Sequence, residues 1–182
     1  MAASIKRVGT MSNRLSVLCA LAMSLLLSGC FTSNVEKFPL AAAVPVFGEG
    51  GSYDLFERSD GDQYERQESF VVKRRSDGGY DFGNDKGDVQ PISFHALVDD
   101  YYVGQAKAEK DRKGYVFTIF RVLPNEAYLY LPQCDEQDQA KLATPGVERV
   151  DRYECSIDGV ADPAALLTGL KLGQPVSKMV RR

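Results

Sequence analysis

Four cysteines are the residues of this 182-residue chain whose chemistry is most readily assigned. Cys19 and Cys30 lie in the first thirty residues, and Cys134 and Cys155 lie in the last third. A thiol can be acylated, oxidised to a disulfide or used as a metal ligand, so its setting decides its role. Cys30 follows an apolar run and two small residues, and the chain beyond it is rich in charged residues and glycine.

The residues before Cys30 have the order of an export signal. Lys6, Arg7 and Arg14 precede an apolar stretch over 15–27, which is shorter than the roughly 20 residues of a membrane-spanning helix. The positive flank favours the cytoplasmic side, so the sequence predicts that the remainder is exported. Cys19 lies inside the apolar stretch and should leave with the signal.

The segment Leu27-Ser28-Gly29-Cys30 resembles the lipobox of bacterial lipoproteins. The resemblance implies cleavage before Cys30, a diacylglyceryl thioether on its sulfur, and a further acyl chain such as palmitate on its new amino group. Two or more chains suffice for a stable anchor. Phe31 stands where an Asp would favour the inner membrane, so the resemblance points to the outer membrane, facing the periplasm. The alternative, a membrane helix that contains Cys30, is disfavoured by its short span.

The exported part is acidic. Removing residues 1–29 takes away three cations and no carboxylate, which changes the net charge from -3 to -6. Nucleic-acid binding requires clustered cations, so we expect no nucleic-acid partner. All nine Phe and all nine Tyr lie in the exported part, which is long enough for one domain.

Cys134 and Cys155 remain as a pair once the signal is removed and Cys30 carries lipid. An oxidising compartment favours a disulfide between them. Closing a loop of about 20 residues stabilises a fold by about 3 kcal/mol in the chain-entropy view. The alternative is a redox or metal site, but there is no CxxC motif and the lone His95 is distant in sequence.

Other residues do not form a catalytic pattern. His95 is the only histidine, and its alternating run with Ser93 and Leu97 favours a structural role over that of a general base. Carboxylates crowd in two segments: Asp60, Asp62, Glu65 and Glu68, then Asp85 and Asp88. They lack the spacing of an EF-hand, which favours solvated turns. The sequence predicts no catalytic residue, no metal site and no cofactor.

Three tyrosines are candidates for a binding pocket. Tyr101, Tyr128 and Tyr130 lie on runs with strand character, and aromatic rings with polar tips recur in ligand cavities. The alternative is that they are ordinary core or sheet-face residues.

The elements around these residues have β character. Seven short runs joined by turns cover Ser52–Arg58, Glu68–Arg75, Tyr80–Phe82, Val89–Leu97, Tyr101–Ala108, Tyr115–Leu123 and Ala127–Leu131. Asp-Gly pairs at 60–61 and 77–78 supply the positive φ of tight hairpins. The nearly continuous apolar run over 116–120 indicates a strand covered on both faces. An eighth strand is expected over 149–157.

We therefore predict a mainly β fold, an antiparallel meander of about 7 to 8 strands that forms a small barrel or strongly bent sheet. Closure removes the exposed edges of an isolated meander. One short C-terminal helix is expected after Asp162-Pro163, covering one end of the sheet. The expected domain organisation is a signal peptide at 1–29 that is removed, a lipid anchor and tether at 30–49, a single β-rich domain at 50–175 and a loose basic tail at 176–182.

These features favour a lipid-anchored cell-envelope lipoprotein whose β domain has a non-enzymatic role in binding or envelope assembly. Its partners would be the membrane, through lipid on Cys30, and an envelope protein. One alternative is a lipocalin-like carrier of a small apolar ligand. Another is an inhibitor of a periplasmic hydrolase that uses the loop over 132–145.

Overall fold

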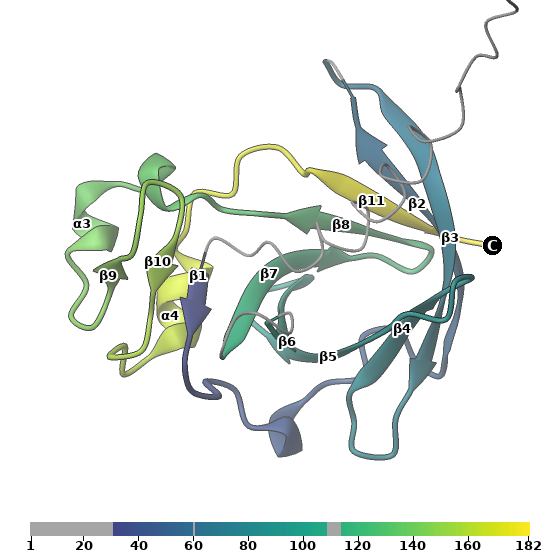
Figure 1. Cartoon of the computed structure of the whole chain (residues 1–182), viewed down its shortest axis with the longest axis horizontal. Coiled ribbons are helices and arrows are strands. Elements are labelled where there is room, and N and C mark those ends of the chain that lie inside the picture. The colour runs from purple at the N-terminus through teal and green to yellow at the C-terminus, as the bar shows by residue number, and fades with distance from the viewer. Residues whose placement is uncertain (1–30, 60, 109–113) are drawn as a thin grey trace, which may run out of the picture.

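The computed structural model describes residues 31–59, 61–108 and 114–182. In this part of the chain eight antiparallel strands close into a barrel (Figure 1). They are β2 (Gly50–Arg58), β3 (Tyr64–Arg74), β4 (Tyr80–Asn84), β5 (Val89–Ala96), β6 (Tyr101–Lys107), β7 (Tyr115–Val122), β8 (Glu126–Tyr130) and β11 (Ser177–Arg181). Their order around the barrel is β6-β5-β4-β3-β2-β11-β8-β7, and β7 pairs back to β6. The predicted mainly β barrel is confirmed.

The barrel interior is filled by side chains. Aromatic rings dominate this core, which contains Phe47, Tyr53, Leu55, Phe70, Val72, Tyr80, Phe82, Ile92, Phe94, Ala106, Val116, Phe120, Ala127, Leu129 and Met179. Gly104 on β6 makes room for one of the rings, since a Cβ there would lie 2.7 Å from the Phe120 side chain. Small and large residues alternate in this way to fill a narrow barrel.

Strand β7 is buried on both faces, as its apolar run predicts. Val116 and Phe120 point into the barrel, whereas Phe117 and Ile119 belong to a second apolar cluster outside it. An outer module covers this second face. It consists of β1 (Phe31–Ser33), η2 (Cys134–Glu136), α3 (Gln139–Leu142), β9 (Glu148–Arg149), β10 (Cys155–Ser156) and α4 (Pro163–Thr168). Figure 1 shows the module beside the barrel, with β1 next to β10.

Helix α4 confirms the predicted start but not the predicted position. Asp162 caps it by accepting a hydrogen bond from the backbone N of Ala165 at 2.9 Å, and Pro163 is the first helical residue. Leu166 and Leu167 belong to the apolar cluster that contains the outward-facing residues of β6 and β7. The helix therefore covers the outside of the barrel wall and not one end of the sheet.

The loose basic tail expected at 176–182 is wrong. Residues 177–181 form β11, which pairs with β2 on one side and β8 on the other, and so closes the barrel. Met179 in its middle is 0% exposed. The segment around Met179 is rich in basic residues, and this composition obscured its alternating strand pattern. This strand, and not the expected run over 149–157, completes the ring of eight. That run is instead divided between β9 and β10 of the outer module.

The tether expected at 30–49 is wrong for its described residues. β1 pairs with β7 and β10, and a 3-10 turn, η1 (Leu40–Ala42), follows it. Phe38 is 7% exposed and stacks on His95 with ring centroids 5.1 Å apart. The Gln105 side chain fastens the segment, because its Oε1 accepts from the backbone N of Lys37 and Phe38 and its Nε2 donates to the Phe38 carbonyl.

The predicted signal at 1–29 and its cysteine, Cys30, lie outside the described residues. Within the described ranges, no helix has the length and apolar character needed to cross a bilayer.

The closing role of β11 predicts unequal effects of two neighbouring substitutions. Met179→Ala should lower the free energy of unfolding by about 2 to 5 kcal/mol, because it leaves a cavity in the barrel core. Lys178→Ala should cost about 1 kcal/mol or less, since that side chain lies outside over the rings of Phe56 and Tyr64. Urea unfolding of both variants measures the difference, and equal small effects would contradict a closing strand.

Candidate functional site

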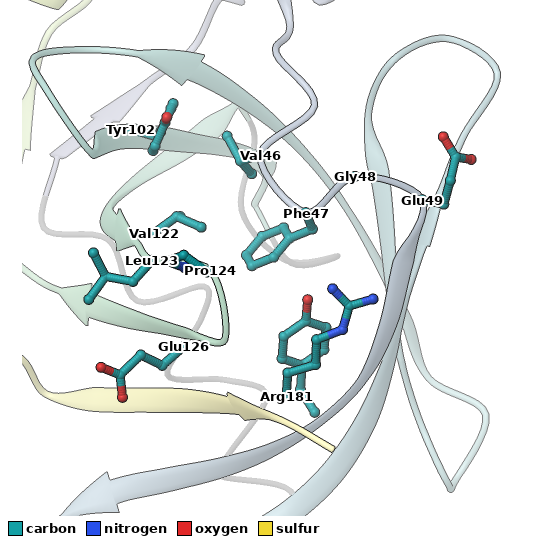
Figure 2. Close-up of a pocket in the computed structure, with 11 residues that line it drawn as sticks. Val46, Phe47, Gly48, Glu49, Tyr102, Val122, Leu123, Pro124, Glu126 and Arg181 are labelled. Carbon is teal, nitrogen blue, oxygen red and sulfur yellow. The ribbon is translucent and has the colours of Figure 1, made fainter.

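A groove of about 410 Å³ opens at one end of the barrel (Figure 2). One wall is the plug segment, which we define as residues 44–49 between η1 and β2. The other walls are side chains from β2, β6, β7, β8 and β11, together with the turn at Leu123 and Pro124. The groove therefore joins segments that are distant in sequence.

Phe47 forms the floor of the groove and closes the barrel interior below it. It is 6% exposed, and its ring packs edge-on against those of Tyr53, Tyr80, Phe82 and Phe94, with centroids 5.3 to 5.8 Å apart. Such edge-to-face pairs add to the energy of burial. Phe47 thus holds the plug segment in a fixed position.

Hydrogen bonds from Tyr80 fix the backbone of the plug segment. The Tyr80 hydroxyl accepts from the backbone N of Phe47 at 3.2 Å and donates to the carbonyl of Gly48 at 2.8 Å. The chain then turns into β2 at Gly50, which has φ 99°. A Cβ at Gly50 would lie 2.1 Å from the Val72 carbonyl oxygen, so only glycine fits there.

Arg181 supplies a cation to the groove. Its Nη2 donates to the carbonyl of Gly50 at 3.0 Å, which orients the guanidinium beside the floor. Burial raises the pKa of the neighbouring Tyr53, and the positive charge of Arg181 partly offsets this. Figure 2 shows Phe47 in the middle of the groove, the Arg181 guanidinium below it, and Glu49 and Glu126 pointing away on opposite sides.

The groove combines an apolar surface with one fixed guanidinium. Tyr102, Val122 and Leu123 present apolar atoms beside Phe47. An apolar side chain or acyl segment can pack there, and an anionic group can bind Arg181, because guanidinium groups pair well with carboxylates. The arrangement suits recognition of a short peptide segment or of a small amphipathic molecule.

The three tyrosines predicted to line a cavity lie elsewhere. Ala127 and Leu129 of β8 point into the barrel, so Tyr128 and Tyr130 between and beyond them point outward. Tyr101 on β6 joins them on the same outer face, packed against the second apolar cluster. The interpretation of Tyr101, Tyr128 and Tyr130 as lining residues of a barrel cavity is therefore wrong.

The structure does bring the tyrosines together, in a row across the outside of the barrel. In the register of β6, β7, β8, β11 and β2, Tyr101 lies opposite Arg121, which lies opposite Tyr128, followed by Lys178 and Phe56. The Arg121 guanidinium lies 5.8 Å from the centre of the Tyr101 ring and binds the Asp100 carboxylate at 2.8 Å. Alternating rings and cations of this kind stabilise neighbouring strands.

Tyr130 is the most perturbed of the three. It is 8% exposed, and its ring lies 6.0 Å from that of Tyr101. The pKa of Tyr130 is raised to about 12. Burial is the largest cause, followed by the charge of Tyr101 and the hydrogen bond to it. A buried phenolate has no water to solvate its charge, so burial favours the neutral phenol and raises the pKa.

The predicted disulfide between Cys134 and Cys155 is confirmed. The Cα atoms are 5.6 Å apart, and both side chains are fully buried in the outer module. The bond joins η2 to β10, and β10 in turn pairs with β1. It therefore ties the loop after β8 to the first described strand.

Three further titratable groups whose pKa is shifted by burial, His95, Glu57 and Glu68, do not line the groove. His95 is 4% exposed beneath the segment that contains Phe38, and burial lowers its pKa. Glu57 and Glu68 lie toward the other end of the barrel, and burial raises the pKa of each. No group of three or more His, Cys, Asp or Glu side chains in the described residues has a metal-binding arrangement.

The sequence around the groove residues did not indicate a binding site, because of the composition of the segments that contain them. Phe47 lies in a segment with three alanines and two prolines that reads as a linker, and Arg181 lies in a basic run that reads as a tail. The usable signal was the pair of aromatic residues in that segment, Phe38 and Phe47, because an apolar ring of this size is usually buried.

The raised pKa of Tyr130 predicts a change of stability in alkali. An unfolded tyrosine ionises near pH 10, so between about pH 10 and 12 the folded state retains a proton that the unfolded state has lost. The neutral Tyr130 side chain therefore contributes in full to the free energy of unfolding below pH 10, and this contribution should be lost as the pH rises toward 12. Tyr130→Phe should weaken this loss and remove the last step of an ultraviolet titration. Tyr153→Phe, which removes an exposed phenol, should leave that step in place.

Comparison with known proteins gives no further assignment. No family model, curated protein or solved structure matches this chain. Inference about function therefore rests on the chain's own residues and on the barrel that they form.

Proposed function

We propose that this chain is a lipid-anchored lipoprotein of the bacterial cell envelope, attached through Cys30, whose β-barrel domain binds an envelope protein without catalysis. The observation that carries the proposal is the position of the segment Leu27-Ser28-Gly29-Cys30, which ends directly before the first described strand. A cysteine at that boundary separates a hydrophobic leader from a folded domain. The outer membrane, facing the periplasm, is the proposed location.

The disulfide supports export. Disulfides persist outside the cytoplasm and are rare within it. Cys134 and Cys155 are bonded and buried, so the bond belongs to the folded core of the outer module. This agrees with an envelope compartment.

The groove at the barrel mouth is the proposed binding site. Its walls are preformed by the barrel strands and by the Phe47 plug, so little conformational entropy is lost when a ligand binds. An apolar residue of the partner would pack against Phe47 and Tyr102, and an adjacent carboxylate would pair with Arg181. Lipid attachment would raise the effective concentration of the domain at a partner in the same membrane.

The two alternative functions receive less support from the geometry. A lipocalin-like carrier holds its ligand inside the barrel, whereas fifteen buried side chains fill this interior. An inhibitory loop at 132–145 would have to be both rigid and exposed. This segment contains η2 and α3 and is held by Gln137, which bonds to Gln133 and Lys171, but its first half is partly buried, at Cys134 and Gln137.

Metabolic labelling tests the anchor. Radiolabelled palmitate should enter the wild-type protein in a lipoprotein-processing host, and Cys30→Ser should abolish both the label and the removal of the signal. Cys19→Ser is the matched control and should be labelled normally, because it lies within the removed segment. Unlabelled wild-type protein in the membrane fraction would contradict the proposal.

Site-specific photo-crosslinking in cells tests the binding role. A photoreactive phenylalanine analogue at Leu123, on the groove wall, should yield a discrete adduct with one envelope protein. The same analogue at Val71, an exposed position on β3, should not yield that adduct. Equal adducts from both positions, or none from Leu123, would contradict binding through the groove.

A further inference from the structure

One short loop of the outer module exposes two large hydrophobic side chains. The docking loop, which we define as residues 150–153, follows β9 and is joined to β10 by Glu154. In the described part of the chain six large hydrophobic residues are exposed, and this loop carries two of them, Val150 at 59% and Tyr153 at 51%. The other four lie at residues 35, 71, 89 and 98, and of these Val71 and Val89 flank Gly83 on adjacent strands of the barrel.

The docking loop lies at the end of the module where the chain enters β1. β1 and β10 are parallel, with Phe31 opposite Cys155 and Thr32 opposite Ser156. The N-terminal end of β1 therefore lies on the same side as the residues before Cys155, which are Glu154 and the docking loop. Cys30 directly precedes Phe31 in the sequence, so a lipid on it would be attached to this end.

Strand β1 is held firmly, so it offers no slack between residue 30 and the domain. Phe31 is 1% exposed and pairs with Phe117 of β7 as well as with β10. After the strand, the Ser33 hydroxyl and the Asn34 backbone N donate to the Asp158 carboxylate at 2.7 and 2.6 Å. A lipid attached to Cys30 would thus hold this end of the outer module against the bilayer.

We infer that the docking loop inserts Val150 and Tyr153 into the lipid interface beside the acylated Cys30. The inference rests on the proposed lipid anchor and adds the orientation of the domain on the membrane. The occupant of the exposed apolar patch is the bilayer itself, because the anchor brings the loop to that surface. A tyrosine suits this position, since its ring is apolar and its hydroxyl remains among the headgroups.

The loop is ordered by internal contacts that leave these two side chains exposed. The Asp151 carboxylate accepts from the backbone N of Tyr153 and Glu154 at 2.7 and 2.8 Å. The carbonyl of Tyr153 accepts from the backbone N of Cys134 at 3.1 Å, next to the disulfide. Insertion would therefore require little ordering of the loop, which favours binding.

The chain contains no tryptophan, so a single introduced indole reports on the loop alone. We would prepare full-length lipidated Tyr153→Trp protein in vesicles of phosphatidylethanolamine and phosphatidylglycerol, with and without brominated acyl chains. Val71→Trp is the matched control, because Val71 is exposed on β3, four strands from β7 in either direction around the barrel. Flotation of each sample with its vesicles measures the anchor separately.

The expected result is blue-shifted emission from Tyr153→Trp and a several-fold larger loss of that emission in brominated vesicles than for Val71→Trp. Protein that floats but shows equal quenching at both positions would overturn the docking inference and leave the anchor intact. A blue shift without quenching by brominated lipid would indicate a protein occupant and would also overturn it. Protein that fails to float would overturn both the anchor and the docking.

Discussion

Strand β7 carries large apolar side chains on both faces, and covering both of them determines the architecture. Its inward residues, Val116 and Phe120, become buried when the barrel closes. Its outward residues, Phe117 and Ile119, remain to be covered, and the outer module performs this task. Two cores therefore share one strand, which links the barrel to the disulfide-bonded module. Burial of apolar area is the main favourable term in folding, so neither face is free to stay exposed.

The shared strand also joins the start of the domain to its centre. β1 pairs along one half of an edge of β7, and β8 pairs along the other half. The segment after β1 then crosses the outside of β5 and β6, where Gln105 and His95 contact it, and reaches the barrel mouth at Phe47. The first described segment is thus fixed to the barrel at three places: at β7, at Gln105 and His95, and at Phe47. A lipid on Cys30 would be joined to a rigid body and not to a flexible stalk.

The placement of the tyrosines on β8 depended on strand alternation, which by itself does not tell the inner face of a strand from the outer one. The pattern on β8, with Tyr128 and Tyr130 separated by Leu129, offers an aromatic face and an aliphatic face, and either can be the inner one. On the adjacent strands β11 and β2, Met179 and Leu55 point into the same core as Ala127 and Leu129, together with the rings of Phe94 and Phe120, and this shared burial selects the inner face of β8. No local feature of residues 126–130 contains that information.

Local chemistry was sufficient for the seven expected strand runs over 52–131, their turns, the capped helix at Asp162 and the pairing of Cys134 with Cys155, since each depends on neighbouring residues or on simple elimination. Tertiary structure decided that residues 177–181 close the barrel, that Phe47 plugs its mouth, and that the groove and the docking loop exist. These features join segments far apart along the chain. Their energy comes from contacts that form only when the sheet curls, and no short stretch of sequence encodes such contacts.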